Sequence, residues 1–419
     1  MNGNKCGWMP LRIHEKGGRR MISVGIDVSK GKSTICILKP YGEIVKSPFD
    51  VQHTNSGLES LVQILEGLDE EFRIAMEATG AYHYPILYYL KEKGYFVTLV
   101  NPLEMKRYRC QGLRNPKTDR IDAKIIATYV LDYWNSIKDY AVSDESYAEL
   151  RLLTRQYRKY MDFRVGAMTS LTDILDMTMP GIRTVLIDWN KYSNHDPLSD
   201  FSYDFWHYDN VKKFSKEEFV EEYAKWAKEK GFHRSEAKAV ALYELAHEEI
   251  PTLPSGTPST KMLVQEAVQL VRKINASLYE ILTRMQKLAK EFPEYQTVRN
   301  MSGVGDTLAP RLIGEIGDVR RFPNASALIA YAGIDAPPYQ SGRFIGTERH
   351  ISKRGSSNLR KIGFETMTCA NVAKKPDDPV YLYMQKKKAE GKPGKVAKIA
   401  GMNKFLRIYY ARVKELYQE

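Results

Sequence analysis

The sequence is poor in cysteine, and the four cysteines that it has are far apart. Cys6, Cys36, Cys110 and Cys369 form no C-x-x-C pair. This spacing argues against a disulfide scaffold and a zinc site, and it fits a reducing cytosol. The chain also lacks any apolar run near the ~18 residues that a membrane span needs. Its basic, Gly-rich start has no apolar signal-peptide stretch. We therefore expect a cytoplasmic protein without a membrane partner.

Acidic residues are too few to balance the basic ones. The chain has 63 Lys and Arg against 51 Asp and Glu, a formal net charge of +12, and a pI near 9.2. Such a surplus indicates a polyanionic partner, most simply nucleic acid, although charge alone does not separate this from an ordinary basic protein. The 27 tyrosines favour nucleic acid slightly, because aromatic rings among basic residues suit stacking on unpaired bases.

The length of 419 residues, 43% of them hydrophobic, allows two or three domains. Periodic structure starts after Met21, so we expect residues 1–20 to be a disordered tail, or Met21 to be the true start. The patterns predict domains at 21–140, 141–292 and 293–419.

The first of these domains alternates short strands with helices. Apolar alternation predicts five strands, and capping and turn residues predict three helices. The strands are expected at 21–28, 33–38, 43–51, 72–76 and 95–100, and the helices at 54–67, 82–93 and 120–131. This β-β-β-α-β-α-β-α order predicts an α/β ribonuclease-H-like (RuvC-like) domain, with three antiparallel strands followed by parallel crossovers.

The middle of the chain is expected to be mainly helical. One long helix is predicted at 143–179, and a second follows a linker at 251–260. The second helix carries a heptad seam, formed by Val264, Ala267, Val271, Ile274, Leu278, Ile281, Met285 and Leu288. The seam predicts a coiled-coil contact with the first helix, within one chain or between protomers. The alternative is an amphipathic helix packed on its own domain. Residues 181–250 look like an aromatic insert with short helices.

Four carboxylates in the first domain suggest a metal site. Asp27 and Glu77 each follow a short apolar run, and Asp119 and Asp122 share one face of a predicted helix. Like charges at close range cannot all ionise unless a cation lies between them. One or two Mg²⁺ ions suit such oxygen ligands and phosphate substrates, and Mn²⁺ is also possible.

A second candidate site surrounds Ser341, which lies between Gln340 and Gly342 after Pro337-Pro338. Gly342 permits a sharp turn that would expose the hydroxyl. Nearby basic residues would offset the charge of a phosphodiester, and a metal would polarise the hydroxyl or the phosphate. They are Arg343, Arg349, Lys353, Arg354 and Arg360. A serine in a turn is more often structural, and Ser352, Ser356 and Ser357 are alternative nucleophiles.

Two further patterns are candidates for nucleic-acid binding. Gly303 and Gly305 open a predicted helix in a pattern that resembles a helix-hairpin-helix backbone clamp, against the alternative of a plain tight turn. The long helix at 143–179 carries basic residues that could hold RNA phosphates or could be solvated flank charges. They are Arg151, Arg155, Arg158, Lys159 and Arg164.

Taken in order, the motifs resemble the DEDD transposases of bacterial and archaeal insertion sequences. They are GIDVSK, AMEATG, NPLEMKRYR, KTDRIDA, GVGDTLAPRLIGEIGD, YAGIDAPPYQSG and ISKRGSSNLR. The resemblance covers roughly residues 21–135 and 292–370 in motif detail. It implies a RuvC-like domain followed by a mainly α C-terminal transposase domain, in a prokaryotic, nucleoid-associated protein. The 181–250 insert departs from the family, so its role stays open.

The resemblance also implies functional residues. Asp27, Glu77, Asp119 and Asp122 fall on the family's metal-binding tetrad, and Ser341 falls on its catalytic serine, which forms a covalent phosphoserine link to DNA. Members act as recombinases guided by a bridge RNA that pairs with donor and target DNA. They are homo-oligomers, with the acids and the serine drawn from different subunits.

Three other functions remain open from the sequence. A RuvC-like nuclease or junction resolvase would need the acids but not Ser341, because activated water attacks. GIDVSK also resembles the first phosphate-binding turn of sugar kinases and actin-like ATPases. In such an enzyme Asp119 and Asp122 would have no catalytic role. A non-catalytic RNA-binding protein descended from a transposase is the third.

Overall fold

The computed structural model describes residues 21–78, 82–109, 118–140, 145–187, 195–336, 340–341, 344–345 and 350–418. The expected tail at 1–20, together with Arg343 and Arg349, lies outside these ranges. The chain divides into two compact units, Met1–Val142 and Ser143–Glu419. The division of the second unit into domains at 141–292 and 293–419 stays a prediction.

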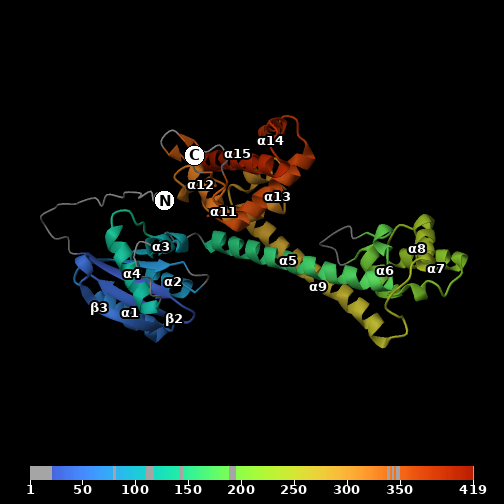
Figure 1. The fold of residues 1–419 in the computed structure, drawn as a ribbon, viewed down its shortest axis with the longest axis horizontal. Helices are drawn as coiled ribbons and strands as arrows, with labels where there is room; N and C mark the ends of the chain where they lie inside the picture. Colours follow the sequence, from blue (N-terminus) through green and yellow to red (C-terminus); the bar gives the residue numbers. More distant parts are fainter. Residues whose placement is uncertain are drawn as a thin grey trace. The chain divides into compact units, whose positions relative to one another are not determined.

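The first unit is built on a mixed five-stranded sheet (Figure 1). The strands are β1 (Met21–Val28), β2 (Lys32–Leu38), β3 (Ile44–Gln52), β4 (Glu71–Glu77) and β5 (Val97–Val100). Their order is β3-β2-β1-β4-β5. β1–β2 and β2–β3 are antiparallel, whereas β1–β4 and β4–β5 are parallel. This order and polarity are those of the ribonuclease-H-like fold, so the fold prediction is confirmed.

Helices cover both faces of this sheet. They are α1 (Asn55–Glu66), α2 (Tyr84–Glu92), α3 (Pro102–Arg109) and α4 (Asp119–Asp132). The apolar side chains of α1 and α2 share a core with Ile22, Val24 and Ile26 of β1. The helix α3, which begins at Pro102 after the end of β5, was not predicted. Proline is favoured at a first helical position, where no backbone N–H is required.

Gly25 in β1 sets how closely α4 approaches the sheet. A Cβ at Gly25 would lie 2.2 Å from the backbone nitrogen of Ala127 and 2.3 Å from the carbonyl oxygen of Ala123. Only glycine therefore allows this helix to lie directly against the central strand. The close packing fixes the start of α4 beside the carboxyl end of β1.

The second unit contains two long helices that pack along each other (Figure 1). They are α5 (Glu145–Thr178) and α9 (Pro258–Ala289). The expected partnership of these helices is present within the chain. The seam is offset from the predicted one, because Val268, Asn275 and Leu282 are fully buried in α9. The expected Ala267, Ile274 and Ile281 are only partly buried. Asn275 accepts a hydrogen bond from Arg164 Nε at 2.8 Å, and such a polar pair in a seam fixes register.

The insert packs at one end of this helix pair (Figure 1). It contains α6 (Pro197–Phe205), α7 (Lys216–Glu229) and α8 (Glu236–Glu248) with short 3₁₀ turns. Its aromatic residues form a core: Phe201 stacks on Phe205 at 4.4 Å, and Trp226 meets Phe201 edge-on at 5.5 Å. The aromatic excess of the insert is therefore largely structural.

The other end of the helix pair packs into the C-terminal domain. Its helices are α10 (Tyr295–Arg299), α11 (Leu308–Ile316), α12 (Ala325–Ala332), α13 (Ser357–Ala373), α14 (Pro379–Ala389) and α15 (Gly394–Glu415). Two short strands, β6 (Gln340–Ser341) and β7 (Phe344–Ile345), pair antiparallel. Tyr147 of α5 and Tyr417 both donate to the buried Glu294 carboxylate, at 2.7 and 2.8 Å, which joins α5 to both ends of this domain. Within the described residues, no helix is both long and apolar enough to cross a membrane.

Candidate active site

The four candidate acids lie at the ends of elements that meet at one edge of the sheet. Asp27 lies near the end of β1, and Glu77 is the last residue of the parallel neighbour β4. Asp119 and Asp122 occupy the first turn of α4, whose N-cap Thr118 accepts from the backbone N–H of Ile121 at 3.3 Å. Because α4 packs on β1 at Gly25, its first turn brings both acids toward Asp27.

The pKa of the Asp27 carboxyl reflects how close the other acids lie. Burial, followed by the nearby Asp122, Asp119 and Glu77 carboxylates, raises the pKa of its carboxyl to about 6, against the opposing charge of Arg109. Asp122 is buried and Asp119 is exposed. A carboxyl held among three others is unfavourable to ionise without a cation.

Arg109, the last residue of α3, supplies a positive charge within the cluster. Its Nη2 donates to Glu77 Oε2 at 3.0 Å, and its Nε lies 3.5 Å from Asp122 Oδ1. Arg109 was not among the predicted site residues. The signal that would have found it is proline at the first helical position of a basic segment, which predicts α3.

The fit of a metal to this site rests on the chemistry of its ligands. Carboxylate oxygens are the ligands that hard divalent cations prefer. In the described part of the chain, no group of three or more Asp, Glu, His or Cys side chains is placed so that it could hold a metal ion. The carboxylates of Glu77 and Asp122 turn to Arg109 instead. The carboxylate oxygens of the four acids suit a divalent cation. In this structure the Arg109 guanidinium provides the positive charge beside Glu77 and Asp122.

An open cleft of 340 Å³ borders Asp119. It is lined by Lys32, Thr34, Asp50, Thr118, Asp119 and Arg120. Asp50 is held by Thr34 Oγ1 at 2.7 Å and Lys32 Nζ at 3.0 Å, and these bonds lower the pKa of its carboxyl. The cleft leaves the exposed Asp119 open to solvent.

Ser341 belongs to the second unit. It is the last residue of β6 and pairs with Phe344 of β7. The basic residues near it in sequence have different surroundings. Lys353 and Arg354 are exposed, and Lys353 has a positive φ of 54°. Arg360 donates from Nη1 to the carbonyl oxygens of Ala332 at 3.0 Å and Gly355 at 2.9 Å, so its guanidinium partly stabilises the local backbone.

The basic residues of α5 mostly face the rest of the unit. Arg151 donates from Nε to the carbonyl oxygen of Gly314 at 3.1 Å. Arg155 lies 3.4 Å from the fully buried Glu315, whose carboxylate also accepts from Ser356 at 2.6 Å. Arg158 donates to the side chain of Asn358. Lys159 is exposed.

The two candidate glycines precede α11 rather than open it, because that helix begins at Leu308. Gly303 has φ +75°, and a Cβ there would lie 2.5 Å from the carbonyl oxygen of Thr366 in α13. Close packing therefore requires this glycine. Gly305 has open space at its Cβ position, and its carbonyl oxygen accepts from Leu308 and Ala309.

Comparison with known proteins identifies relatives over most of the chain. A family model for DEDD transposases, described as a transposase, matches residues 24–180, and the model of the transposase IS116/IS110/IS902 family matches residues 295–381. An uncharacterized 44.8 kDa protein of insertion element IS116 from Streptomyces clavuligerus is 24% identical over 374 residues, which are 88% of this chain and 89% of that protein.

Shorter similarities cover parts of the chain. A pilin gene-inverting protein of Moraxella bovis is 30% identical over 113 residues, 27% of this chain and 34% of that protein. Among solved structures, RuvC of Thermus thermophilus is 14% identical with a TM-score of 0.24, over 29% of this chain and all of RuvC. The same protein in complex with a Holliday junction substrate gives a TM-score of 0.23 at 14% identity, over 29% of this chain and 99% of that one.

Proposed function

Because this chain belongs to the DEDD transposase family of insertion sequences, we propose that it cleaves and rejoins DNA through a covalent phosphoserine intermediate at Ser341. The observation that carries the proposal is the convergence of Asp27, Glu77, Asp119 and Asp122 on one edge of a ribonuclease-H-like sheet. The family and its acids indicate dependence on a divalent metal, and we propose Mg²⁺, with Mn²⁺ as a substitute.

The proposed chemistry conserves the phosphodiester bond. A divalent metal bound there would supply charge neutralisation at the scissile phosphate. Ser341 Oγ forms a bond to phosphorus and loses its proton, while the phosphorus–oxygen bond to the deoxyribose breaks and leaves a hydroxyl. After strand exchange, a strand hydroxyl attacks the phosphoserine and the serine leaves as the alcohol. The four acids would hold the metal, and no ATP would be required because the bond energy stays in the protein–DNA link.

The proposed partners are donor DNA, target DNA and a bridge RNA. Base pairing by the RNA would read the sequence, and the protein would hold backbone and shape. The proposed contacts are basic residues of the second unit, with the backbone at Gly303 and Gly305. The basic residues that the structure describes are exposed or partly exposed: Arg151, Arg155, Arg158, Lys159, Lys353, Arg354 and Arg360. Arg343, outside the described residues, is proposed from its place in the sequence beside Ser341. We also propose a homo-oligomer that combines the acids of one subunit with the serine of another.

The test is a denaturing gel of the full-length protein after incubation with labelled element-end DNA, the RNA transcribed from the element, and Mg²⁺. Wild type is expected to give a protein–DNA adduct. Ser341→Ala is expected to lose both adduct and cleavage. The matched control is Ser357→Ala at the exposed start of α13, which should retain both.

Two results would contradict the serine scheme. Ser341→Ala protein that joins DNA at the wild-type rate would remove the covalent intermediate. Cleavage that needs the four acids but gives no adduct in wild type would indicate the hydrolytic nuclease instead, in which metal-activated water attacks the phosphate.

A further inference from the structure

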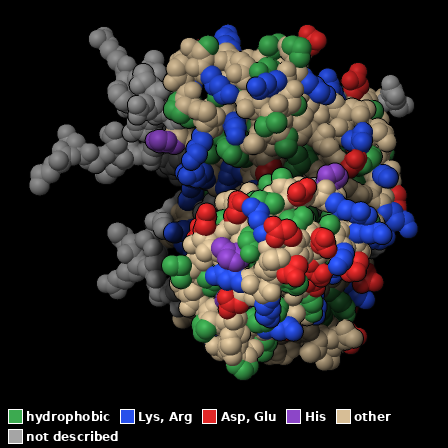
Figure 2. Space-filling view, turned by 90° about the vertical axis from the view of Figure 1, so that its right-hand side faces the viewer, with side chains coloured by type: hydrophobic (Ala, Val, Ile, Leu, Met, Phe, Trp, Pro, Cys, Tyr) green, Lys and Arg blue, Asp and Glu red, His purple; other side chains and the backbone are tan. Residues whose placement is uncertain are grey.

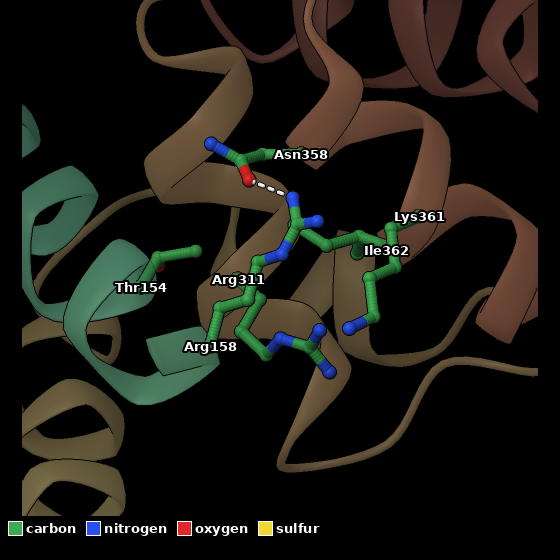
Figure 3. Close-up of a pocket in the computed structure, with 6 residues that line it drawn as sticks. All are labelled: Thr154, Arg158, Arg311, Asn358, Lys361 and Ile362. Carbon is green, nitrogen blue, oxygen red and sulfur yellow. Dashed lines mark hydrogen bonds between the residues drawn. The ribbon is translucent and has the colours of Figure 1, made fainter. Parts of the chain in front are cut away.

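A small cavity opens in the second unit where α5, α11 and α13 meet (Figure 3). We call it the α5–α13 cavity. It is lined by Thr154 and Arg158 from α5, Arg311 from α11, and Asn358, Lys361 and Ile362 from α13. Its volume is 10 Å³, which is room for about one water-sized atom group.

Two buried polar atoms at this cavity have no hydrogen-bond partner among the described residues. They are Thr154 Oγ1 and Arg311 Nε. Thr154 is only 2% exposed and Arg311 only 6%. A buried donor without an acceptor is costly, so such atoms commonly mark a place where a ligand or a water completes the bonding.

The charges around the cavity are mainly positive. In the described part of the chain, Arg158 has only the neutral side-chain oxygen of Asn358 as its partner and forms no ion pair. Arg311 pairs with Glu365 at 2.6 Å, and Lys361 lies 3.4 Å from Asp162 with 41% of its side chain exposed. Three cations therefore face two carboxylates, and the exposed Lys361 marks the open side.

The remaining hydrogen-bonding capacity consists mostly of donors. Arginine and lysine have no acceptor, and Asn358 already uses its oxygen on Arg158, which leaves its amide N–H₂ group. Asn358 also lies in the first turn of α13, whose N-terminus is partially positive. A cavity with these properties disfavours metal cations and favours an oxygen atom that carries negative charge.

We propose that the α5–α13 cavity binds one non-bridging oxygen of a backbone phosphate in nucleic acid. The inference rests on the proposed function, which supplies a polyanionic substrate, and it adds a specific anchoring point. A phosphate oxygen fits the volume, accepts several hydrogen bonds at once, and leaves the rest of the phosphodiester at the open side near Lys361. Arg158 and Lys361 would neutralise the charge of the phosphate. Thr154 Oγ1 and Arg311 Nε would donate hydrogen bonds to its oxygen from the buried side of the cavity.

The test measures binding of full-length protein to a fluorescent DNA duplex and, separately, to a fluorescent RNA hairpin of equal length, over a range of KCl concentrations. Arg158→Gln removes one charge without breaking an ion pair. We expect it to weaken binding about tenfold and to lower the slope of log affinity against log salt by about one. Arg158→Lys should recover part of the loss.

A second variant separates ligand binding from folding. Thr154→Val keeps the shape but removes the partnerless hydroxyl. It is expected to weaken binding severalfold with little change in salt slope, while the melting temperature of the free protein holds or rises. A lower melting temperature with unchanged binding would mean that Thr154 is structural, and would overturn its role as a ligand.

The control is Lys261→Gln, an equal loss of charge on an exposed first turn of α9. A loss with Arg158→Gln confined to the duplex would assign the cavity to DNA, and one confined to the hairpin would assign it to RNA. Equal behaviour of Arg158→Gln and Lys261→Gln on both probes would overturn the inference and leave the proposed function intact. Wild-type protein that binds neither probe would overturn both.

Discussion

Carboxylates gather at the sheet edge of the first unit, whereas cations gather in the second unit where α5 meets α13. At the sheet edge, four acids share the charge of Arg109. At the α5–α13 cavity, three cations face two carboxylates. Each group is electrostatically unfavourable without a ligand, and a ligand of opposite charge would stabilise it. The proposed ligands are a metal cation for the acid cluster and a phosphate for the cavity.

The same contrast appears within the second unit. Lys and Arg far outnumber Asp and Glu over residues 293–419, while Asp and Glu outnumber Lys and Arg over the insert at 181–250. Figure 2, which faces the side where α7 and α8 lie in Figure 1, shows acidic and basic side chains interspersed toward the viewer. The basic surplus of the chain is therefore concentrated in the C-terminal domain, and the insert serves as an internal reference that should not attract phosphates.

The largest expected effect comes from Asp27→Asn. Loss of one metal ligand should lower DNA cleavage by about a thousandfold or more. In EDTA, however, the melting temperature should hold or rise. The pKa of Asp27 is raised from 3.8 to about 6, so the folded wild type loses stability as pH rises through this window, and Asn avoids that loss.

Thermal melts from pH 7.5 downward check this prediction. The advantage of Asp27→Asn over wild type should shrink as pH falls through about 6 toward 3.8, the range set by the raised pKa of Asp27. A variant that melts well below wild type in EDTA at pH 7.5 would show that Asp27 stabilises the fold, and the contrast between the two clusters would fail.

Arg109→Gln should have an effect of intermediate size. It should lower the melting temperature in EDTA, whereas Asp27→Asn should hold or raise it. Without the guanidinium, Glu77 and Asp122 lose a charged partner at 3.0 and 3.5 Å, which should cost about 1–3 kcal/mol in EDTA. Divalent metal should then raise the melting temperature of the variant more than that of wild type, because the cation replaces the lost charge.

The matched control for Arg109 is Arg120→Gln, an exposed arginine beside the same acids. It should change the melting temperature little, with or without metal. An equal response of the two variants to added Mg²⁺ would remove Arg109 from its place as the internal counter-charge.

The smallest expected effect is that of Lys216→Gln in the insert. Lys216 forms an exposed ion pair with Glu244 at 3.1 Å, and such pairs contribute about 0–1 kcal/mol. Melting temperature and affinity for the duplex and the hairpin should stay near wild type, although the charge change equals that of Arg158→Gln. A tenfold loss of affinity here would show that charge alone, and not the cavity, controls binding.

The N-terminal fold was largely predictable because its strands and helices carry strong local signals. The expected strand at 21–28 matches β1, and the expected helix at 120–131 lies within α4. The helix α3 was missed, since its basic segment has no apolar period. The seam of α9 was placed one residue off at several turns, because several adjacent apolar residues fit a heptad and only packing against α5 selects among them.

The order of the acids along the chain, the surplus of positive charge and the heptad period are properties of the sequence alone. They determined the ribonuclease-H-like domain, the pairing of α5 with α9, and the family. Tertiary structure alone decided that Arg109 enters the acid cluster, and that Thr154, Arg311 and Lys361 line one cavity. These residues come from segments far apart in the chain, and no local pattern encodes a contact that forms only when helices pack together.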